Sequence, residues 1–323
     1  MFAKPNHARV LEGAEERQLN ITSVRKLEFR LAVSRAKLRS VAQNAEAYYS
    51  PFPSPPRIRP FQKKFRPIKD RTIDNPLEPL RGIQKRIHHR LLASLDLPFY
   101  FCGGVKGRNL LDNVTMHLGA SVVVAVDIKD FFPSINNLRI YEIWTKLLGC
   151  SPEIASLLTR LTTRRHYLPQ GSSTSTMLAN LALFSVDAPI RQACEKQGVH
   201  YSTWVDDLAF SGDHAREVIP TVVHTLRDAG FRVSRSKIRV MGPGTRKVLN
   251  GILLDRFPNV LPERFSQLRS GIHKLATGKV PRAQLRDYLS QLGSSIAQVG
   301  SINPGTAARL KSDFDLARLC VSA

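Results

Sequence analysis

The sequence has few acidic residues for its size. It contains 26 Asp and Glu against 48 Lys and Arg, which gives a formal net charge of +22, and its isoelectric point is near 10.4. A chain so poor in acid is a weak match for a basic partner. The imbalance favours a polyanionic one instead, through phosphate neutralisation and release of counterions.

Cysteine and long apolar runs are scarce as well. The four cysteines lie far apart, at Cys102, Cys150, Cys194 and Cys320. Their spacing excludes a paired zinc motif and a disulfide framework, so we interpret them as small buried hydrophobes in a reducing compartment. The N-terminus lacks the apolar core of a signal peptide, and no apolar run approaches the length needed to span a membrane. The prediction is a cytoplasmic protein without a membrane partner.

The composition is that of a folded protein with a localised excess of base. The chain has 323 residues, of which 42% are hydrophobic and 23% charged, enough for a sizeable core and for more than one compact unit. Eleven Lys or Arg lie between Pro51 and Arg90, and another eleven between Phe231 and Val280. A solvated surface is the simpler interpretation for any single one of them. Together, the two blocks flank an acidic centre in the sequence, as the walls of a nucleic-acid channel would.

Helical and extended segments alternate along the chain. Helices are expected within 12–46, from Glu78 onwards, at 137–149 and 152–162, over 215–229, and in a basic C-terminal part beyond Pro262. The proline-rich stretch 50–56 is expected to lack regular structure and to mark a boundary. Residues 57–75 are β-prone and suggest a small sheet or hairpin. The pattern predicts an α+β protein.

Two neighbouring acids, Asp206 and Asp207, interrupt the β-prone run from Tyr201 to Gly212. This pattern predicts a hairpin with the acids at or near its turn. Side chains alternate along a strand, so a joint metal site needs a third acid. Asp127 closes the apolar run 121–127, which is typical of a buried strand. Aspartates in turns often serve only as hydrogen-bond acceptors, but carboxylates on two metal ions suit Mg²⁺ and nucleotidyl transfer.

Two loops carry further signals. Gln170-Gly171 opens the run into a helix, where Gly permits close approach and Gln offers both a donor and an acceptor to a base pair or sugar. The serines and threonines that follow are equally well explained as helix caps. The Gly-rich, cationic stretch from Tyr100 to His117 matches neither nucleotide-binding glycine motif. By itself it is weak evidence for phosphate binding.

Taken in order, these blocks resemble the prokaryotic reverse transcriptases, in particular the retron type, from roughly Phe61 to Leu310. The resemblance implies a right-hand polymerase with fingers, a palm of antiparallel sheet and packed helices, and a helical thumb. The implied boundaries are an N-terminal helical extension at 1–56, fingers at 57–120, palm at 121–255 with fingers helices 137–170 inserted, and thumb at 256–323.

The resemblance also implies roles for individual residues. It makes Asp127, Asp206, Asp207 and Lys237 catalytic, with Lys237 protonating the leaving pyrophosphate. It assigns two Mg²⁺ ions to Asp127, Ile128, Asp206 and Asp207. The residues implied to bind substrate are Arg71, Phe132, Gln170, Gly171 and Trp204, and those implied to bind RNA are Lys106, Arg108, Asn113 and His117. Phe132 falls at the aromatic gate that excludes a ribose 2′-hydroxyl, which implies dNTP use.

The sequence departs from the family pattern at four places. Val114 replaces an alanine, Thr176 a proline, Trp204 a tyrosine, and Leu249-Asn250 the first two residues of Val-Thr-Gly. The tryptophan keeps an aromatic platform for the primer terminus but loses the hydroxyl. Rate or fidelity is therefore expected to differ.

The implied function is that of a retron RNA-directed DNA polymerase. It copies a structured non-coding RNA that also supplies the priming 2′-hydroxyl, retains the RNA–DNA product, and acts in antiphage defence with an effector protein encoded nearby. Template removal is expected from a host RNase H, because only a short tail follows the thumb. Two alternatives stay open: a defence-associated or unclassified reverse transcriptase without a retron RNA, and a catalytically silent RNA-binding scaffold.

Overall fold

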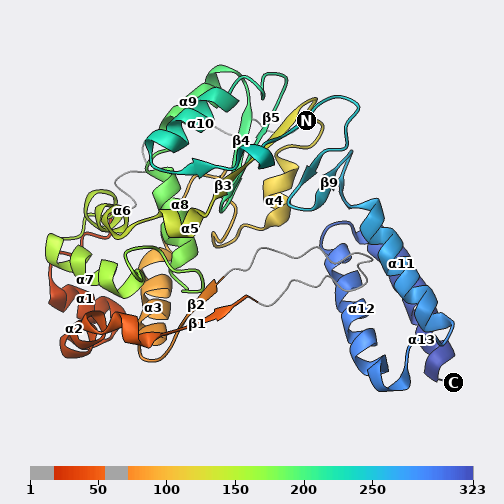
Figure 1. Ribbon diagram of the computed structural model, residues 1–323, viewed down its shortest axis with the longest axis horizontal. Coiled ribbons are helices and arrows are strands. Elements are labelled where there is room, and N and C mark those ends of the chain that lie inside the picture. Colours follow the sequence, from red (N-terminus) through yellow and green to blue (C-terminus); the bar gives the residue numbers. More distant parts are fainter. Residues whose placement is uncertain (1–17, 55–71, 323) are drawn as a thin grey trace. The chain divides into compact units, whose positions relative to one another are not determined.

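The computed structural model describes residues 18–54 and 72–322. They divide into two units, one of residues 18–54, 72–113 and 122–240, and one of residues 114–121 and 241–322 (Figure 1). Both contain helices and antiparallel strands, so the α+β prediction is confirmed. The boundary between the units after Val240 precedes the one expected between palm and thumb at 255/256. Among the helices of the described residues, none combines the length and the apolar character needed to cross a bilayer.

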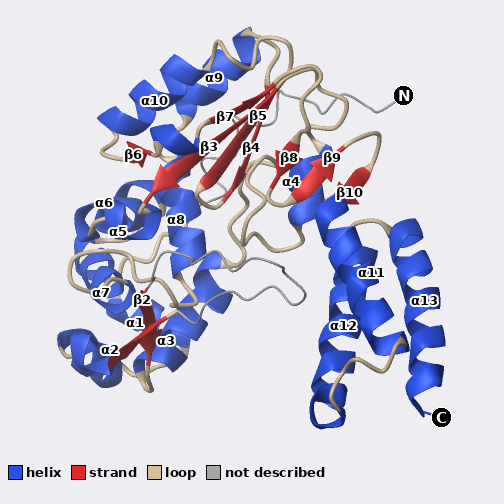
Figure 2. Cartoon of the chain, turned by 45° about the vertical axis from the view of Figure 1, so that its right-hand side comes forward, coloured by secondary structure: helices blue, strands red, loops and turns tan. Residues whose placement is uncertain are grey.

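The central sheet of the first unit forms around β3 (Val123–Lys129), whose first four residues are buried. The strand order is β4 (His200–Trp204), β5 (Asp207–Ser211), β3 and β6 (Arg232–Val233), and β7 (Arg239–Met241) also pairs with β3. The pairs β4–β5, β5–β3 and β3–β6 are all antiparallel. Figure 2 shows α9 (Ala188–Lys196) and α10 (Ile219–Asp228) lying together along one side of this sheet.

The chain up to Lys237 contains many further helices, most of which contribute to one hydrophobic core. They are α1 (Val24–Leu31), α2 (Arg35–Gln43), η3 (Ala45–Tyr48), α3 (Leu80–Ile87), η4 (His88–Leu92), α4 (Leu110–Thr115), α5 (Phe131–Ser134), α6 (Asn137–Glu142), η5 (Ile143–Leu147), α7 (Pro152–Thr162), α8 (Ser175–Phe184) and η6 (Arg235–Lys237). The helical spacing of apolar residues decides which face is buried: Leu80, Ile83, Ile87 and Leu91 are at most 2% exposed. The helices expected at 78–91, 137–149 and 152–162 are thereby confirmed.

The expectation that the proline-rich stretch 50–56 lacks regular structure is wrong for residues 50–53. Residues 49–53 form β1 (Tyr49–Pro53), which pairs with β2 (Thr72–Pro76). Pro51 lies opposite Asp74, Pro53 opposite Thr72, and Tyr49 opposite Pro76. Backbone N–H groups of residues two apart point to the same edge of a strand, so all three prolines fall in pairs that exchange no backbone hydrogen bond. A two-stranded ribbon tolerates proline in this alternating register.

The second unit has its own small sheet and core. Strands β8 (Val248–Leu249), β9 (Ile252–Leu254) and β10 (Pro258–Val260) form a sheet in the order β10-β9-β8. Asn250 and Gly251 have φ of 49° and 81°, the left-handed pair that a two-residue hairpin turn requires. The helices are α11 (Pro262–Ala276), η7 (Arg282–Gln284), α12 (Leu285–Gly300) and α13 (Pro304–Ser322), with α11 to α13 side by side (Figure 1). Leu268, Leu275, Leu292 and Leu310 are fully buried among them.

Two of the arginines on the polar face of α3 and η4 bind another helix. Arg86 Nη1 donates to the carbonyl oxygens of Leu31 and Ala32, both at 3.1 Å, and Arg90 Nη1 donates to that of Arg30 at 3.2 Å. These carbonyls end α1, where Ala32 is left-handed with φ of 49°. A cation at a helix C-terminus satisfies unpaired carbonyls and the negative end of the helix dipole. The contact ties α1 to α3.

Removing this cap predicts a measurable loss of stability. Arg86→Ala is expected to lower the free energy of unfolding by about 1 kcal/mol. This is less than a hydrogen bond to a charged group usually contributes, because the side chain is exposed to solvent. Urea unfolding followed by circular dichroism measures the change. Lys85→Ala, one residue away on the exposed face, is the control. Equal stability of the Arg86 variant and the control would contradict the capping role.

Candidate active site

The main chains of the three predicted catalytic aspartates lie next to one another. Asp127 on β3 is directly opposite Asp207 on β5 in the antiparallel register. Asp206 precedes Asp207, and its carbonyl oxygen accepts a hydrogen bond from the Ile128 N–H at 3.0 Å. Residues about 80 positions apart in the chain therefore meet at one point of the sheet. The convergence expected from the sequence is present in the backbone.

The acidic hairpin turns through Val205 and Asp206. Trp204, the last residue of β4, pairs with Asp207, the first of β5, so the predicted hairpin is confirmed. Val205 has φ of 60°, a left-handed conformation that is unusual for a β-branched residue. Because Asp206 lies in the turn, strand alternation does not force its side chain to the face opposite that of Asp207.

A Gly-Gly pair that the sequence left as a weak signal packs against this turn. A Cβ on Gly103 would lie 2.7 Å from the Val205 backbone nitrogen and from Val205 Cγ2, and a Cβ on Gly104 would collide with the Thr176 methyl group. The Asn180 side chain donates to the Gly103 carbonyl at 2.8 Å. The segment also joins β4, since the Cys102 N–H donates to the Thr203 carbonyl at 3.0 Å. Close packing, visible only in three dimensions, accounts for both glycines.

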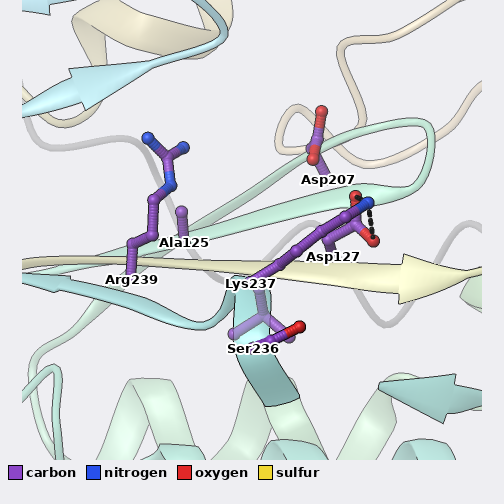
Figure 3. A pocket seen from close by; sticks show the side chains of 7 residues that line it. Ala125, Asp127, Asp207, Ser236, Lys237 and Arg239 are labelled. Atoms are coloured by element: carbon purple, nitrogen blue, oxygen red, sulfur yellow. Dashed lines mark hydrogen bonds and ion pairs between the residues drawn. The ribbon is translucent and has the colours of Figure 1, made fainter. Parts of the chain in front are cut away.

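Two of the aspartates share a pocket with cationic side chains. A cavity of about 340 Å³ is lined by Ala125, Val126, Asp127, Asp207, Ser236, Lys237 and Arg239 (Figure 3). Lys237 Nζ donates to both carboxylate oxygens of Asp127 at 2.9 Å (Figure 3). The Asp127 side chain is 19% exposed and that of Lys237 58%. The pocket thus combines two carboxylates with two cations that can meet phosphate.

The position of Asp207 raises the pKa of its carboxyl to about 6, from an ordinary value of 3.8. Partial withdrawal from water is the largest cause, followed by repulsion from the carboxylates of Asp206 and Asp127. Lys237 and Arg239 act in the opposite direction. The residue keeps contact with solvent, so screening moderates the repulsion. An excess of negative charge at this point is what a divalent cation would neutralise.

The carboxylate and carbonyl oxygens are of the kind that binds Mg²⁺, but in this conformation they do not form a complete metal site. Among the described residues, no three His, Cys, Asp or Glu side chains are close enough to hold a metal ion. In this conformation the Lys237 ammonium takes the cation position on Asp127. Ile128 has an apolar, buried side chain, so only its backbone carbonyl could bind metal. Carboxylate and carbonyl oxygens remain the ligands that Mg²⁺ prefers.

The described residues among those implied to bind substrate are absent from the lining of this pocket. Phe132 is half-buried on α5 and packs edge-on against Phe131, with ring centroids 6.0 Å apart. Trp204 is half-buried beside Asp207. Gln170 and Gly171 lie in the loop before α8, held to β2 by the Asp74 backbone. Arg71 lies outside the described residues.

Three of the four residues implied to bind RNA are engaged inside the protein. The Arg108 guanidinium donates to the carbonyls of Leu97 at 2.6 Å and Phe101 at 2.7 Å. The Asn113 amide, 1% exposed, donates to Ser202 Oγ at 2.8 Å. His117 is fully buried, and Lys106 is exposed. Contact of these residues with RNA stays a prediction, and the observed bonds of Arg108 and Asn113 shape the loops around β4.

Comparison with known proteins agrees with this geometry. The family model for reverse transcriptase (RNA-dependent DNA polymerase) matches residues 58–277. The mixed α+β fold with its antiparallel sheet is that of a right-hand polymerase. Within that class, the chain belongs to the reverse transcriptase family, whose members use divalent metal ions.

The similar curated proteins are retron reverse transcriptases. The chain is 27% identical to the Retron Ec86 reverse transcriptase of Escherichia coli, over 72% of this chain and 74% of that protein. It is 29% identical to the Retron Se72 enzyme of Salmonella heidelberg (strain 579083-10), over 60% and 49% respectively. It is 27% identical to the Retron Mx65 enzyme of Myxococcus xanthus, over 74% and 60%. The matches therefore span between about half and three quarters of these relatives.

Among solved structures, the chain matches the telomerase from Candida albicans in complex with a TWJ fragment of telomeric RNA. The TM-score is 0.45 at 10% sequence identity, over 86% of this chain and 59% of that one.

The raised pKa of Asp207 predicts a pH-dependent carboxyl near the pocket. In metal-free protein, carboxyl ¹³C NMR is expected to give a titration midpoint near 6, and Asp206→Asn is expected to lower it by removing repulsion. Because the folded protein retains a proton that the unfolded chain has released, this group favours folding more as the pH falls from 6 towards 4. Asp213→Asn is the control. A midpoint at the ordinary aspartate value would contradict the partial burial of Asp207, and a midpoint unchanged in Asp206→Asn would contradict repulsion from Asp206.

The Lys237–Asp127 contact predicts competition between ammonium and metal. Lys237→Ala is expected to raise the affinity for Mn²⁺ several-fold, since the carboxylate loses a cation at 2.9 Å. Electron paramagnetic resonance of free Mn²⁺ measures binding without turnover. Lys146→Ala, which removes an exposed ion pair with Glu142, is the matched control. Unchanged or weaker Mn²⁺ binding in the Lys237 variant would show that the ammonium does not compete.

Proposed function

We propose that this chain is the RNA-directed DNA polymerase of a retron, copying a structured non-coding RNA into DNA with two Mg²⁺ ions. The observation that carries the proposal is the register of β3 and β5, which brings Asp127 opposite Asp207 in a pocket shared with Lys237. Family membership and the similarity to retron enzymes support the substrate class.

The proposed metal ligands are the carboxylates of Asp127 and Asp206, assisted by Asp207 and the Ile128 carbonyl. When bound, the two ions would activate the primer hydroxyl and neutralise charge on the departing pyrophosphate. The chain's own residues orient the substrates. Lys237, released from Asp127, places an ammonium donor beside the triphosphate and can protonate the leaving group.

The substrate-binding residues select and orient the nucleotide in this proposal. Phe132 blocks a ribose 2′-hydroxyl, Trp204 supports the primer terminus, and Gln170 with Gly171 contacts the nascent base pair. Arg71 grips the triphosphate. Three of these residues have a described neighbour that supports this placement: Phe131 beside Phe132, Asp207 beside Trp204, and β2 beside Gln170.

Charge on the N-terminal helices supports an RNA partner. Helices α1, α2 and α3 with η4 together carry ten Lys or Arg and one acid, Glu28. That single carboxylate, which accepts a bond from the Arg35 N–H, leaves a surplus of nine positive charges on these helices (ten minus one). The most exposed large apolar side chain of the described residues, Phe29 at 85%, lies on α1. Cations beside an exposed ring suit a strand of RNA with unstacked bases.

The remaining partners follow from the retron assignment. The RNA supplies both template and primer, dNTPs are consumed, and the RNA–DNA hybrid is retained. A nearby effector protein acts with the enzyme in antiphage defence, and a host RNase H removes the template in the cytoplasm. Sequencing of the nucleic acid that copurifies distinguishes a single self-primed hybrid, which supports the retron, from a mixture, which favours an unclassified reverse transcriptase.

Removing the charge of Asp127 or of Asp206 is expected to abolish DNA synthesis and to leave RNA binding intact. Asp127→Asn and Asp206→Asn are expected to reduce primer extension on an RNA template with Mg²⁺ and dNTPs below detection, because metal ligands are removed. RNA affinity, measured by filter binding, is expected to stay within about twofold. Asp313→Asn, exposed on α13, is the matched control. Continued DNA synthesis by either variant would refute the site, and an inactive wild type would favour a silent scaffold.

A further inference from the structure

The segment between α7 and α8 forms a tight turn that ends in the Gln170-Gly171 loop. Arg164 and Tyr167 exchange two backbone hydrogen bonds, at 2.8 and 2.9 Å. Arg165 and His166 between them have φ of 45° and 66°, the geometry of a two-residue hairpin turn. The Leu168 N–H then donates to the Ile135 carbonyl at 2.9 Å. Each end of this turn is bonded, so the direction in which the chain enters the loop is set.

Asp74 on β2 binds the main chain of Gln170 through both its backbone N–H and its carboxylate. The Asp74 N–H donates to the Gln170 carbonyl at 2.6 Å, and the Gln170 N–H donates to Asp74 Oδ2 at 3.2 Å. The Asp74 amide is available for this bond because its partner on β1 is Pro51, and the pair 51/74 exchanges no backbone hydrogen bonds. The proline register of β1 and the attachment of the loop are therefore linked.

The other oxygen of Asp74 binds Arg164, in a pair removed from water. Asp74 Oδ1 accepts a hydrogen bond from Arg164 Nη1, and the two side chains are 5% and 6% exposed. Arg164 also lies 5.3 Å from the centre of the Tyr49 ring, and its Nε is 3.8 Å from Glu46 Oε2. A buried carboxylate needs such a partner, since an uncompensated charge in this place would be strongly unfavourable.

Gly171 allows the loop to approach the backbone of β2 closely. Its φ is 127°, and a Cβ built on it would lie 2.9 Å from the Asp74 carbonyl oxygen and 2.9 Å from Ile73 Cγ2. Both the conformation and the space exclude any other residue. The loop therefore rests directly on the backbone of β2, with no side chain between them to absorb a shift.

We propose that Asp74 and Arg164 are a positioning pair for nucleotide selection. By fixing the Gln170 main chain against β2, the pair sets where the Gln170 side chain meets the nascent base pair. The inference rests on the proposed function, because it assigns the loop to the incoming deoxynucleotide. It adds residues on β2 and after α7 that touch no substrate and act through Gln170. Glu46, from the N-terminal helical segment, supports the pair from its outer side.

The test is single-nucleotide incorporation by Asp74→Asn, which keeps the shape of the side chain and removes the charge. The KM for the correct dNTP is expected to rise about tenfold, the loss typical of one charged hydrogen bond, and the misincorporation ratio is expected to rise with it. The kcat per active site, counted by active-site titration, and the affinity for primer–template are expected to stay near wild type. A purely structural role would lower the active fraction and leave KM unchanged.

Two further variants keep the test decisive. Glu46→Gln weakens the outer support of Arg164 without creating a buried charge, and is expected to raise KM in the same direction by a smaller factor. Arg39→Ala, which breaks an exposed ion pair with Glu153 on α7, is the matched control. Folding of each variant is checked by thermal unfolding.

The outcomes distinguish failure of the proposed positioning role from failure of the proposed polymerase function. If Asp74→Asn folds and its KM stays within twofold of wild type, the positioning role is overturned. If that variant does not fold, a wild-type KM in Glu46→Gln overturns it. If wild-type protein extends no primer at all, the proposed function fails instead.

Discussion

The pairing of β3 with β5 imposes an electrostatic problem that the surrounding residues resolve. Antiparallel register brings Asp127 opposite Asp207, with Asp206 in the adjoining turn. Partial burial, together with repulsion from the neighbouring carboxylates, raises the pKa of Asp207 to about 6. The Lys237 ammonium on Asp127 offsets part of the excess. A fold that assembles these acids therefore needs a cation there, and the lysine supplies one in this conformation.

The same pairing makes the hairpin turn critical. Val205 holds a left-handed conformation that a β-branched residue adopts only under constraint. The constraint comes from Gly103, which leaves no room beneath the turn, and from Asn180, which anchors the Gly103 carbonyl. Thr176, where the family pattern has proline, packs its methyl group on Gly104. This departure is thus accommodated by a small neighbour, and the geometry of the acids is retained.

Sequence patterns were sufficient for the parts of the fold in which local chemistry decides the outcome. Helix α7 begins at Pro152 and ends at Thr162, as the first-turn proline and the apolar spacing indicate. The acidic hairpin forms where aromatic and β-branched runs meet. Strand β1 was missed because four prolines in seven residues argue against a strand, and only its register with β2 shows that the rings avoid the bonded positions. Periodicity contains no information on such pairing.

The residues of the candidate site divide in the same way, into those that the local sequence indicates and those that only the folded structure reveals. The aspartates could be placed from their positions in strand and turn, whereas Asp74 and Arg164 gave no signal, since a charged pair is recognisable as buried only once distant segments have met. Arg108 illustrates the converse, because its charge suggested RNA while its guanidinium binds loop carbonyls. In a chain with a net charge of +22, abundance of base says little about any one residue. An arginine whose donors are occupied by protein carbonyls, as those of Arg86 and Arg108 are, holds the scaffold, and the surplus left after such bonds is what remains to attract phosphate.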